Sequence, residues 1–226
     1  MKQPIKLSPI AASGATMVER AGWRIAEKYS LPEAEAAAAR KSVGLADLSA
    51  AGKVLIQGRE APAALQAAFG AAPGRVGEVA AVKGGLLACL AFEDWYLTAP
   101  IGGEARALEA VNQAISAAGV FAHATDLTHA NAALLLAGPN SRDVLPKICG
   151  LDFHPSVFPN RTAAQSSVAR VHTIIIRDDL QGGSLPAYQL HISRSEAAYL
   201  WEALADAASE FGGQPIGASA LAALSS

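Results

Sequence analysis

The stretch Asp126–Cys149, which reads DLTHANAALLLAGPNSRDVLPKIC, decides the fold. Its apolar run Ala132–Ala137 is bounded by turn residues and is too short for a helix, so a buried strand is predicted. Gly138-Pro139 ends that strand, because proline has no amide hydrogen to donate to a neighbouring strand. A helix that buries Val144 and Leu145 is expected to follow. The stretch is therefore predicted to form a strand, a tight turn and a helix.

The same order of features occurs about eighty positions earlier in the chain. Asp47-Leu48-Ser49 corresponds to Asp126-Leu127-Thr128, and the apolar run Val54–Ile56 corresponds to the later buried strand. Gly58 closes this run, and a helix is expected over Glu60–Phe69. Because internal repeats dictate architecture, the chain is predicted to contain two similar halves.

Each half has the same expected plan of strand, helix, two or three strands, and helix. Such a plan predicts an α+β fold in which antiparallel sheet is covered by helices on one face. We expect an N-terminal lobe over residues 1–119, a C-terminal lobe over 120–226, and a ligand pocket between them. The remaining expected strands are 78–82, 86–91, 95–99, 165–170, 172–176 and 187–193, and the remaining helices are 32–40, 104–118 and 195–211.

The composition is apolar and nearly neutral, with 51% hydrophobic residues and a formal net charge of -2. There is no basic excess to neutralise phosphates, so nucleic acid is not an expected partner. No apolar stretch is long enough to span a bilayer, so no membrane association is expected. Met1–Pro4 lacks the apolar core of a secretory signal, and only Cys89 and Cys149 are present, so a cytoplasmic location is predicted.

The sequence lacks the common motifs of phosphate and dinucleotide sites, and it has no nucleophile elbow. Its five histidines are scattered singly, so no metal site is predicted. His191, alone in an expected strand, is interpreted as structural. The residues by themselves therefore indicate an α+β protein of the cytosol with a duplicated core, and no particular reaction.

Two blocks of the sequence resemble aminomethyltransferase, the T-protein of the glycine cleavage system. The first block runs over Gly44–Val54 and is preceded by Ala21-Gly22-Trp23, and the second includes Thr125-Asp126-Leu127 and Arg142–Leu145. The portion Cys149–Gly212 is more similar to the gamma subunit of heterotetrameric sarcosine oxidase, which belongs to the same folate-binding superfamily. The resemblance covers nearly the whole chain, without the C-terminal barrel domain of the full-length transferase.

The resemblance implies a tetrahydrofolate cofactor, and by position it implies four cofactor-binding residues: Leu87, Cys89, Tyr188 and Gln189. The two acids that the family carries after its paired glycines, here Gly84-Gly85, are replaced by Ala88 and Cys89. The family's late-strand glutamate is replaced by Gln189, and an arginine–aspartate pair near the domain end falls on Leu221-Ala222. The identity of any catalytic residue is therefore left unknown.

The resemblance predicts a tetrahydrofolate-binding, T-protein-like protein of one-carbon metabolism whose chemistry is degenerate, because the expected acids are missing. If active, the protein would be a tetrahydrofolate-dependent aminomethyltransferase or demethylase. The alternative is a non-catalytic, gamma-like subunit of a sarcosine-oxidase-type complex. Partner subunits or a homo-oligomer are the corresponding expectations for its interactions.

Overall fold

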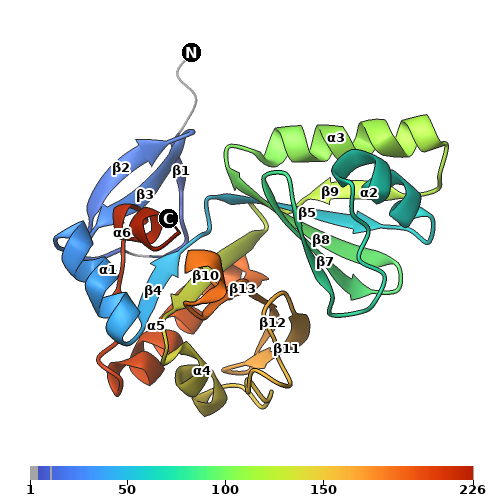
Figure 1. Ribbon diagram of the computed structural model, residues 1–226. Coiled ribbons are helices and arrows are strands. Elements are labelled where there is room, and N and C mark those ends of the chain that lie inside the picture. Colours follow the sequence, from blue (N-terminus) through green and yellow to red (C-terminus); the bar gives the residue numbers. More distant parts are fainter. Residues whose placement is uncertain (1–4, 11, 226) are drawn as a thin grey trace.

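The computed structural model of the protein describes residues 5–10 and 12–225, so the Met1–Pro4 segment lies outside the described residues. Within the described part, helices pack on three β-sheets, which confirms the predicted α+β fold class. The two larger sheets form two neighbouring lobes, and the smallest sheet lies beside the C-terminal end of the chain (Figure 1).

The larger lobe is built on a six-stranded sheet. Its strands are β4 (Gly44–Asp47), β10 (Asn131–Ala137), β11 (Ala163–Val168), β12 (Val171–Arg177), β13 (Ala187–Ser193) and β14 (Gln214–Pro215). Their spatial order is β11-β12-β13-β10-β4-β14. Helices α4 (Ser141–Val144) and α5 (Ala197–Ser209) cover one face, where Leu134, Leu190 and Leu200 belong to one buried apolar core. Because both faces of β10 are covered, its sequence is a continuous apolar run rather than an alternating one.

The second lobe is built on a five-stranded sheet. Its strands are β5 (Ala51–Gln57), β6 (Val79–Val82), β7 (Gly85–Ala91), β8 (Asp94–Ile101) and β9 (His123–Asp126). Their spatial order is β6-β7-β8-β5-β9. Helices α2 (Ala61–Phe69) and α3 (Glu104–Ala118) cover one face, where Val54, Leu97 and Val111 are buried together. The predicted bounds of α3 agree with the structure, because its apolar residues repeat at helical spacing.

The remaining elements cover part of the second face of the six-stranded sheet, at β4 and β10. Strands β1 (Lys6–Leu7), β2 (Thr16–Arg20) and β3 (Trp23–Lys28) form the smallest sheet, in the order β1-β3-β2. Helices α1 (Pro32–Lys41) and α6 (Ala218–Ser225) pack against β4 and β10, burying Ala39, Leu135 and Leu224. Single 3-10 turns lie at η1 (Leu145–Lys147), η2 (Gln181–Gly183) and η3 (Arg194–Glu196).

The two halves exchange strands, and the repeated Asp-Leu-hydroxyl segments are the points of exchange. Strand β4 comes from the first half but pairs with β10, and β9 comes from the second half but pairs with β5. Asp47 accepts a hydrogen bond from the Ser49 amide, and Asp126 accepts one from the Thr128 amide, both at 2.8 Å. Each segment therefore turns in the same way and carries the chain from one sheet into the other sheet.

Matching hydrogen bonds fix the two crossings. The Leu48 amide donates to the Ala133 carbonyl and the Leu127 amide donates to the Lys53 carbonyl, each at 2.8 Å. The Ser49 hydroxyl accepts from the Ala133 amide at 3.3 Å, and the Thr128 hydroxyl accepts from the Lys53 amide at 3.0 Å. The division of the chain at residues 119 and 120 stays a prediction, since each half contributes a strand to the sheet of the other.

No described helix has both the length and the apolar character that crossing a bilayer requires.

Candidate functional site

The two large sheets meet through their faces at a shared apolar core. The five-stranded sheet contributes Ala88, Leu90 and Tyr96, and the six-stranded sheet contributes Ala163 and Ile176. Side chains alternate between the two faces of a strand. On β13 this alternation directs Tyr188 and Leu190 toward the helices, and it leaves the neighbouring positions on the junction face. The residues that reach this junction are therefore set by strand register.

Four polar side chains form a hydrogen-bonded chain at this junction, and we call them the interlobe cluster: Tyr96, Asn131, Gln189 and His191. Asn131 Nδ2 donates to Tyr96 Oη at 3.3 Å. Tyr96 Oη lies 3.5 Å from His191 Nδ1, and His191 Nε2 lies 3.2 Å from Gln189 Oε1. Because Gln189 Oε1 can only accept, Nε2 carries the imidazole proton and Nδ1 accepts from the Tyr96 hydroxyl. The cluster thus joins β8 of one lobe to β10 and β13 of the other.

The interlobe cluster is electrically neutral at physiological pH. Burial, followed by the positive charge of Lys53, lowers the pKa of His191 to about 3. Burial also raises the pKa of Tyr96 above its usual range, although the hydrogen bond from Asn131 opposes this shift. None of the four side chains is a carboxylate, and the lowered pKa of His191 makes its imidazole a weak base, so the cluster offers hydrogen bonds but no effective general base.

Lys53, on β5, is completely buried beside the crossing of the two halves. Its Nζ donates to the carbonyls of Ser49 at 2.9 Å and Ala51 at 2.7 Å. Burial lowers the pKa of Lys53 from 10.5 to about 8, and the negative charge of Asp47 is the largest opposing influence. The ammonium group therefore holds the first Asp-Leu-hydroxyl turn at a cost in desolvation.

This cost predicts a pH effect on stability. The unfolded chain keeps the Lys53 proton up to about pH 10.5, whereas the folded protein releases it near pH 8. Stability attributable to this group therefore rises as pH rises between these values. In Lys53→Met we expect the gain between pH 8 and 9.5, on the order of 2 kcal/mol, to disappear from the free energy of unfolding in urea. The exposed Lys41→Met control should keep the gain, and an unchanged gain in Lys53→Met would oppose this account.

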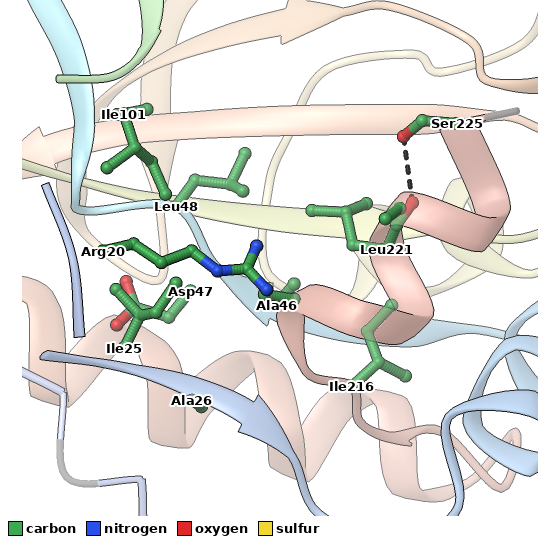
Figure 2. A pocket seen from close by; sticks show the side chains of 13 residues that line it. Arg20, Ile25, Ala26, Ala46, Asp47, Leu48, Ile101, Ile216, Leu221 and Ser225 are labelled. Carbon is green, nitrogen blue, oxygen red and sulfur yellow. Dashed lines mark hydrogen bonds between the residues drawn. The ribbon is translucent and has the colours of Figure 1, made fainter. Parts of the chain in front are cut away.

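A cavity of about 220 Å³ lies beside the first crossing, between the β2–β3 hairpin, β4 and α6 (Figure 2). Asp47 and Arg20 are its charged lining residues, and the Arg20 guanidinium extends into it. That guanidinium donates two hydrogen bonds to Glu27, at 2.8 and 3.0 Å. Leu221 and Ala222, where the family resemblance places an arginine and an aspartate, contribute apolar wall instead. The cavity is therefore less charged than the resemblance implies.

The structure brings only part of the predicted site together. Gln189 belongs to the interlobe cluster, and Ala88 lies in the same junction core. Leu87 and Cys89 lie on the opposite face of β7, in the core under α2 and α3. Tyr188 is buried on the helix-covered face of the other sheet, at ring-centroid distances of 5.6 and 6.3 Å from Phe153 and Phe158. Strand alternation thus places Gln189 and Ala88 on the junction face. It places Leu87, Cys89 and Tyr188 on the opposite faces of their strands.

The Cys89 thiol is also poorly suited to replace a missing acid. It donates to the Ala91 carbonyl at 3.3 Å, and burial, followed by the charges of Glu78 and Asp94, raises its pKa. A thiolate is therefore not the form present at neutral pH.

Sequence reasoning did not identify Tyr96, Asn131 or Lys53 as members of this region. For Lys53 a signal exists, because a lysine in β5 directly before the apolar run Val54–Ile56 has to be paired or neutralised when it is buried. Tyr96 and Asn131 carry no such signal, since each looks like an ordinary strand residue until the two sheets are brought together. Among the described residues, no group of three potential metal ligands is found.

The exchanged strands, the duplicated crossings and the polar junction define a two-lobed domain with a buried polar cluster between the lobes. The chain belongs to the family described as the GCVT N-terminal domain, whose sequence model matches residues 8–225. This membership confirms the resemblance drawn from the two Asp-Leu-hydroxyl blocks.

Curated relatives and solved structures agree with this assignment. The aminomethyltransferase of Saccharopolyspora erythraea is 30% identical over 219 residues, which cover 92% of this chain and 58% of that protein. That of Mycobacterium avium is 30% identical over 215 residues, covering 90% of this chain and 56% of that protein. The chain therefore spans little more than half the length of these relatives.

Solved structures share the fold, among them the following two. The glycine cleavage system aminomethyltransferase T from Bartonella henselae gives a TM-score of 0.81 at 20% identity, covering 97% of this chain and 62% of that chain. A chain of the heterotetrameric sarcosine oxidase from Corynebacterium sp. U-96, in complex with pyrrole 2-carboxylate, gives a TM-score of 0.67 at 26% identity. The second comparison covers 81% of this chain and 93% of that chain.

Proposed function

We propose that the protein binds tetrahydrofolate at the junction of its two lobes, as a T-protein-like member of one-carbon metabolism whose transfer chemistry is degenerate. The observation that carries the proposal is the position of Ala88 and Gln189 on the junction face, beside the Tyr96–His191 pair. Ala88 is one of the two positions at which the family resemblance places acids, and Gln189 is the position at which it places the pterin-binding glutamate. The site keeps the location that the family resemblance implies, but its side chains differ from those of the family. This difference favours a binding function over a catalytic one.

The residues present fit a reduced pterin as a hydrogen-bonding ligand. Gln189 is half-buried, and its Oε1 accepts from His191 while retaining a second lone pair. Its NH2 group adds donors that a glutamate would not have. Tetrahydrofolate would supply the nitrogen that takes up a one-carbon unit when it is bound, and in this chain Gln189 and its neighbours would orient the pterin.

The same residues do not supply acid–base help to a reaction. The methyl group of Ala88 can neither accept nor donate a proton, and the Cys89 thiol lies on the other face of its strand. General acid–base assistance typically contributes a factor of about 10² to 10⁴ in rate, so its loss leaves little turnover. The purified protein is expected to bind tetrahydrofolate in calorimetry and to show negligible folate-dependent demethylation. Absence of binding would overturn the proposal, and robust turnover would overturn the degenerate chemistry.

Restoring the carboxylate is expected to strengthen binding. In Gln189→Glu, a charge-assisted hydrogen bond to the pterin edge replaces a neutral one, and such bonds are worth about 1.5–3 kcal/mol. The gain over the neutral hydrogen bond is about 1–1.5 kcal/mol, so we expect the dissociation constant for tetrahydrofolate to fall by roughly fivefold to tenfold in isothermal calorimetry. Gln113→Glu, on the exposed surface of α3, adds the same charge away from the junction and should leave the affinity unchanged. Equal affinities of wild type and Gln189→Glu would refute the role of Gln189.

A second candidate function is that of a non-catalytic subunit in a sarcosine-oxidase-type complex. It is favoured by the comparison with the heterotetrameric sarcosine oxidase, in which the match covers 93% of the compared chain. Tagged protein isolated from its native cells would then carry oxidase subunits in fixed stoichiometry, identifiable by mass spectrometry. Recovery of the tagged chain alone, at a concentration where it binds tetrahydrofolate, would support the first candidate instead.

A further inference from the structure

A second cavity, of about 360 Å³, opens on the five-stranded lobe between α2, α3, the end of β8 and the β6–β7 turn. We call it the α2–α3 pocket. Its walls include Phe69, Leu97, Pro100 and Ala107. Leu97 belongs to the core under α2 and α3, whereas the interlobe cluster lies on the junction face of the same sheet. The pocket is therefore separate from the proposed folate site.

The β6–β7 turn is held rigidly at the edge of this pocket. The Leu86 amide donates to the Thr98 hydroxyl at 3.1 Å. A Cβ atom on Gly85 would lie 1.7 Å from the Thr98 carbonyl oxygen, so the turn and β8 approach as closely as backbones allow. This contact places Lys83, one of the pocket's lining residues, beside the end of β8.

The start of α3 is held equally closely on the other side. The Gly103 amide donates to the Pro100 carbonyl at 2.8 Å, and a Cβ on Gly103 would lie 3.0 Å from that oxygen. Arg106 follows in the first turn of α3 and also lines the pocket. The pocket thus presents two cationic side chains from two separately anchored segments.

Neither cation is neutralised within the described part of the chain. Lys83 and Arg106 make no ion pair there, and the pocket lining contains no carboxylate. The acids nearest to Arg106 along α3 have other partners: Glu104 lies 3.6 Å from the Lys6 ammonium, and Glu109 accepts from Gln113 at 3.1 Å. The pocket therefore combines apolar walls with unopposed positive charge.

We propose that the α2–α3 pocket binds an apolar monocarboxylate, with its carboxylate between Lys83 and Arg106 and its hydrocarbon body against Phe69 and Leu97. Arginine pairs with carboxylates through two parallel hydrogen bonds, and lysine adds a point charge. The volume lies in the lower part of the range of small-molecule sites, roughly 300–1,000 Å³. A small hydrophilic dicarboxylate would leave the apolar wall uncovered, and an uncharged chain would leave both cations unpaired.

Calorimetric titration of the intact protein with octanoate tests this proposal. We expect saturable binding of one octanoate per chain, and at least tenfold weaker binding of octanamide and of succinate. Lys83→Gln and Arg106→Gln should each weaken octanoate binding by about fivefold or more, and the double variant should abolish it. Arg59→Gln removes an exposed cation outside the pocket and should leave the affinity unchanged.

Thermal unfolding followed by circular dichroism separates loss of the site from loss of the fold, and both cations are exposed, so native melting is expected in every variant. No binding of octanoate to the wild type would overturn the proposal. So would equal octanoate affinity in the wild type and the double variant. Tetrahydrofolate binding should be unaffected by the double variant, so this result is independent of the folate proposal.

Discussion

Replacing His191 with glutamine is expected to remove a large part of the protein's sensitivity to acid. His191 is buried among Tyr96 and Gln189, with the charge of Lys53 nearby, and its pKa is lowered from 6.5 to about 3. The unfolded chain therefore takes up a proton below pH 6.5 that the folded protein does not accept until about pH 3. The contribution of His191 to the free energy of unfolding is fully present above pH 6.5 and is lost as pH falls through this window.

The expected loss over this window is on the order of 5 kcal/mol, since each pKa unit corresponds to about 1.4 kcal/mol. Urea unfolding at pH 7, 5 and 4 should show a steep decline in the wild type and a shallow one in His191→Gln. The carboxylates contribute equally to both proteins, so the difference between them isolates the histidine. The exposed His172→Gln on β12 is the matched control and should decline like the wild type. An identical decline in His191→Gln would contradict the assigned role.

Replacing Gly138 with alanine is expected to destabilise the protein by about 3 kcal/mol or more. Gly138 has a φ of +134°, where a side chain is strained, and its Cβ would lie 2.3 Å from the Ser42 carbonyl oxygen and 2.5 Å from that of Ala39. These are backbone atoms at the end of α1, so they cannot turn away as a flexible side chain could. The loss should appear as a lower urea midpoint with an unchanged slope.

The duplicated fold makes a sharper test possible. Gly58 occupies the corresponding place in the first half, with a φ of +133° and a Cβ position 2.7 Å from the Ala122 Cα atom. Gly58→Ala should therefore be destabilised to a similar extent. Gly150→Ala, where an added Cβ meets nothing within 4 Å, should change stability by no more than about 0.5 kcal/mol. Equal midpoints for Gly138→Ala and Gly150→Ala would show that the close approach is not constraining.

Several elements could be predicted because their physical causes are local. The apolar run Ala132–Ala137 predicted β10, and the helix predicted over 104–118 agrees with α3, whose apolar residues repeat at helical spacing. The two Asp-Leu-hydroxyl segments predicted a duplication, and the structure shows that each aspartate accepts the amide two residues later. Such turns are formed within a few residues, so the sequence contains the information needed to recognise them.

The family-derived site was predictable only in part, because resemblance assigns positions along a strand and not the face of the sheet. Leu87, Ala88 and Cys89 are consecutive, yet only Ala88 reaches the junction. Tyr188 and Gln189 are separated by the same alternation. Residues that are contiguous in the sequence and were predicted to bind one cofactor therefore lie in different cores once the strands are paired.

The sequence by itself determined the class of fold, the repeated crossing segments and the glycines that end the central strands, because each depends on neighbours within one turn or one strand. Only the tertiary structure decided that Tyr96 meets His191, that Lys53 is buried at a crossing, and that Lys83 and Arg106 share a pocket. These residues come together through strand exchange and sheet register, which depend on pairings between segments far apart along the chain.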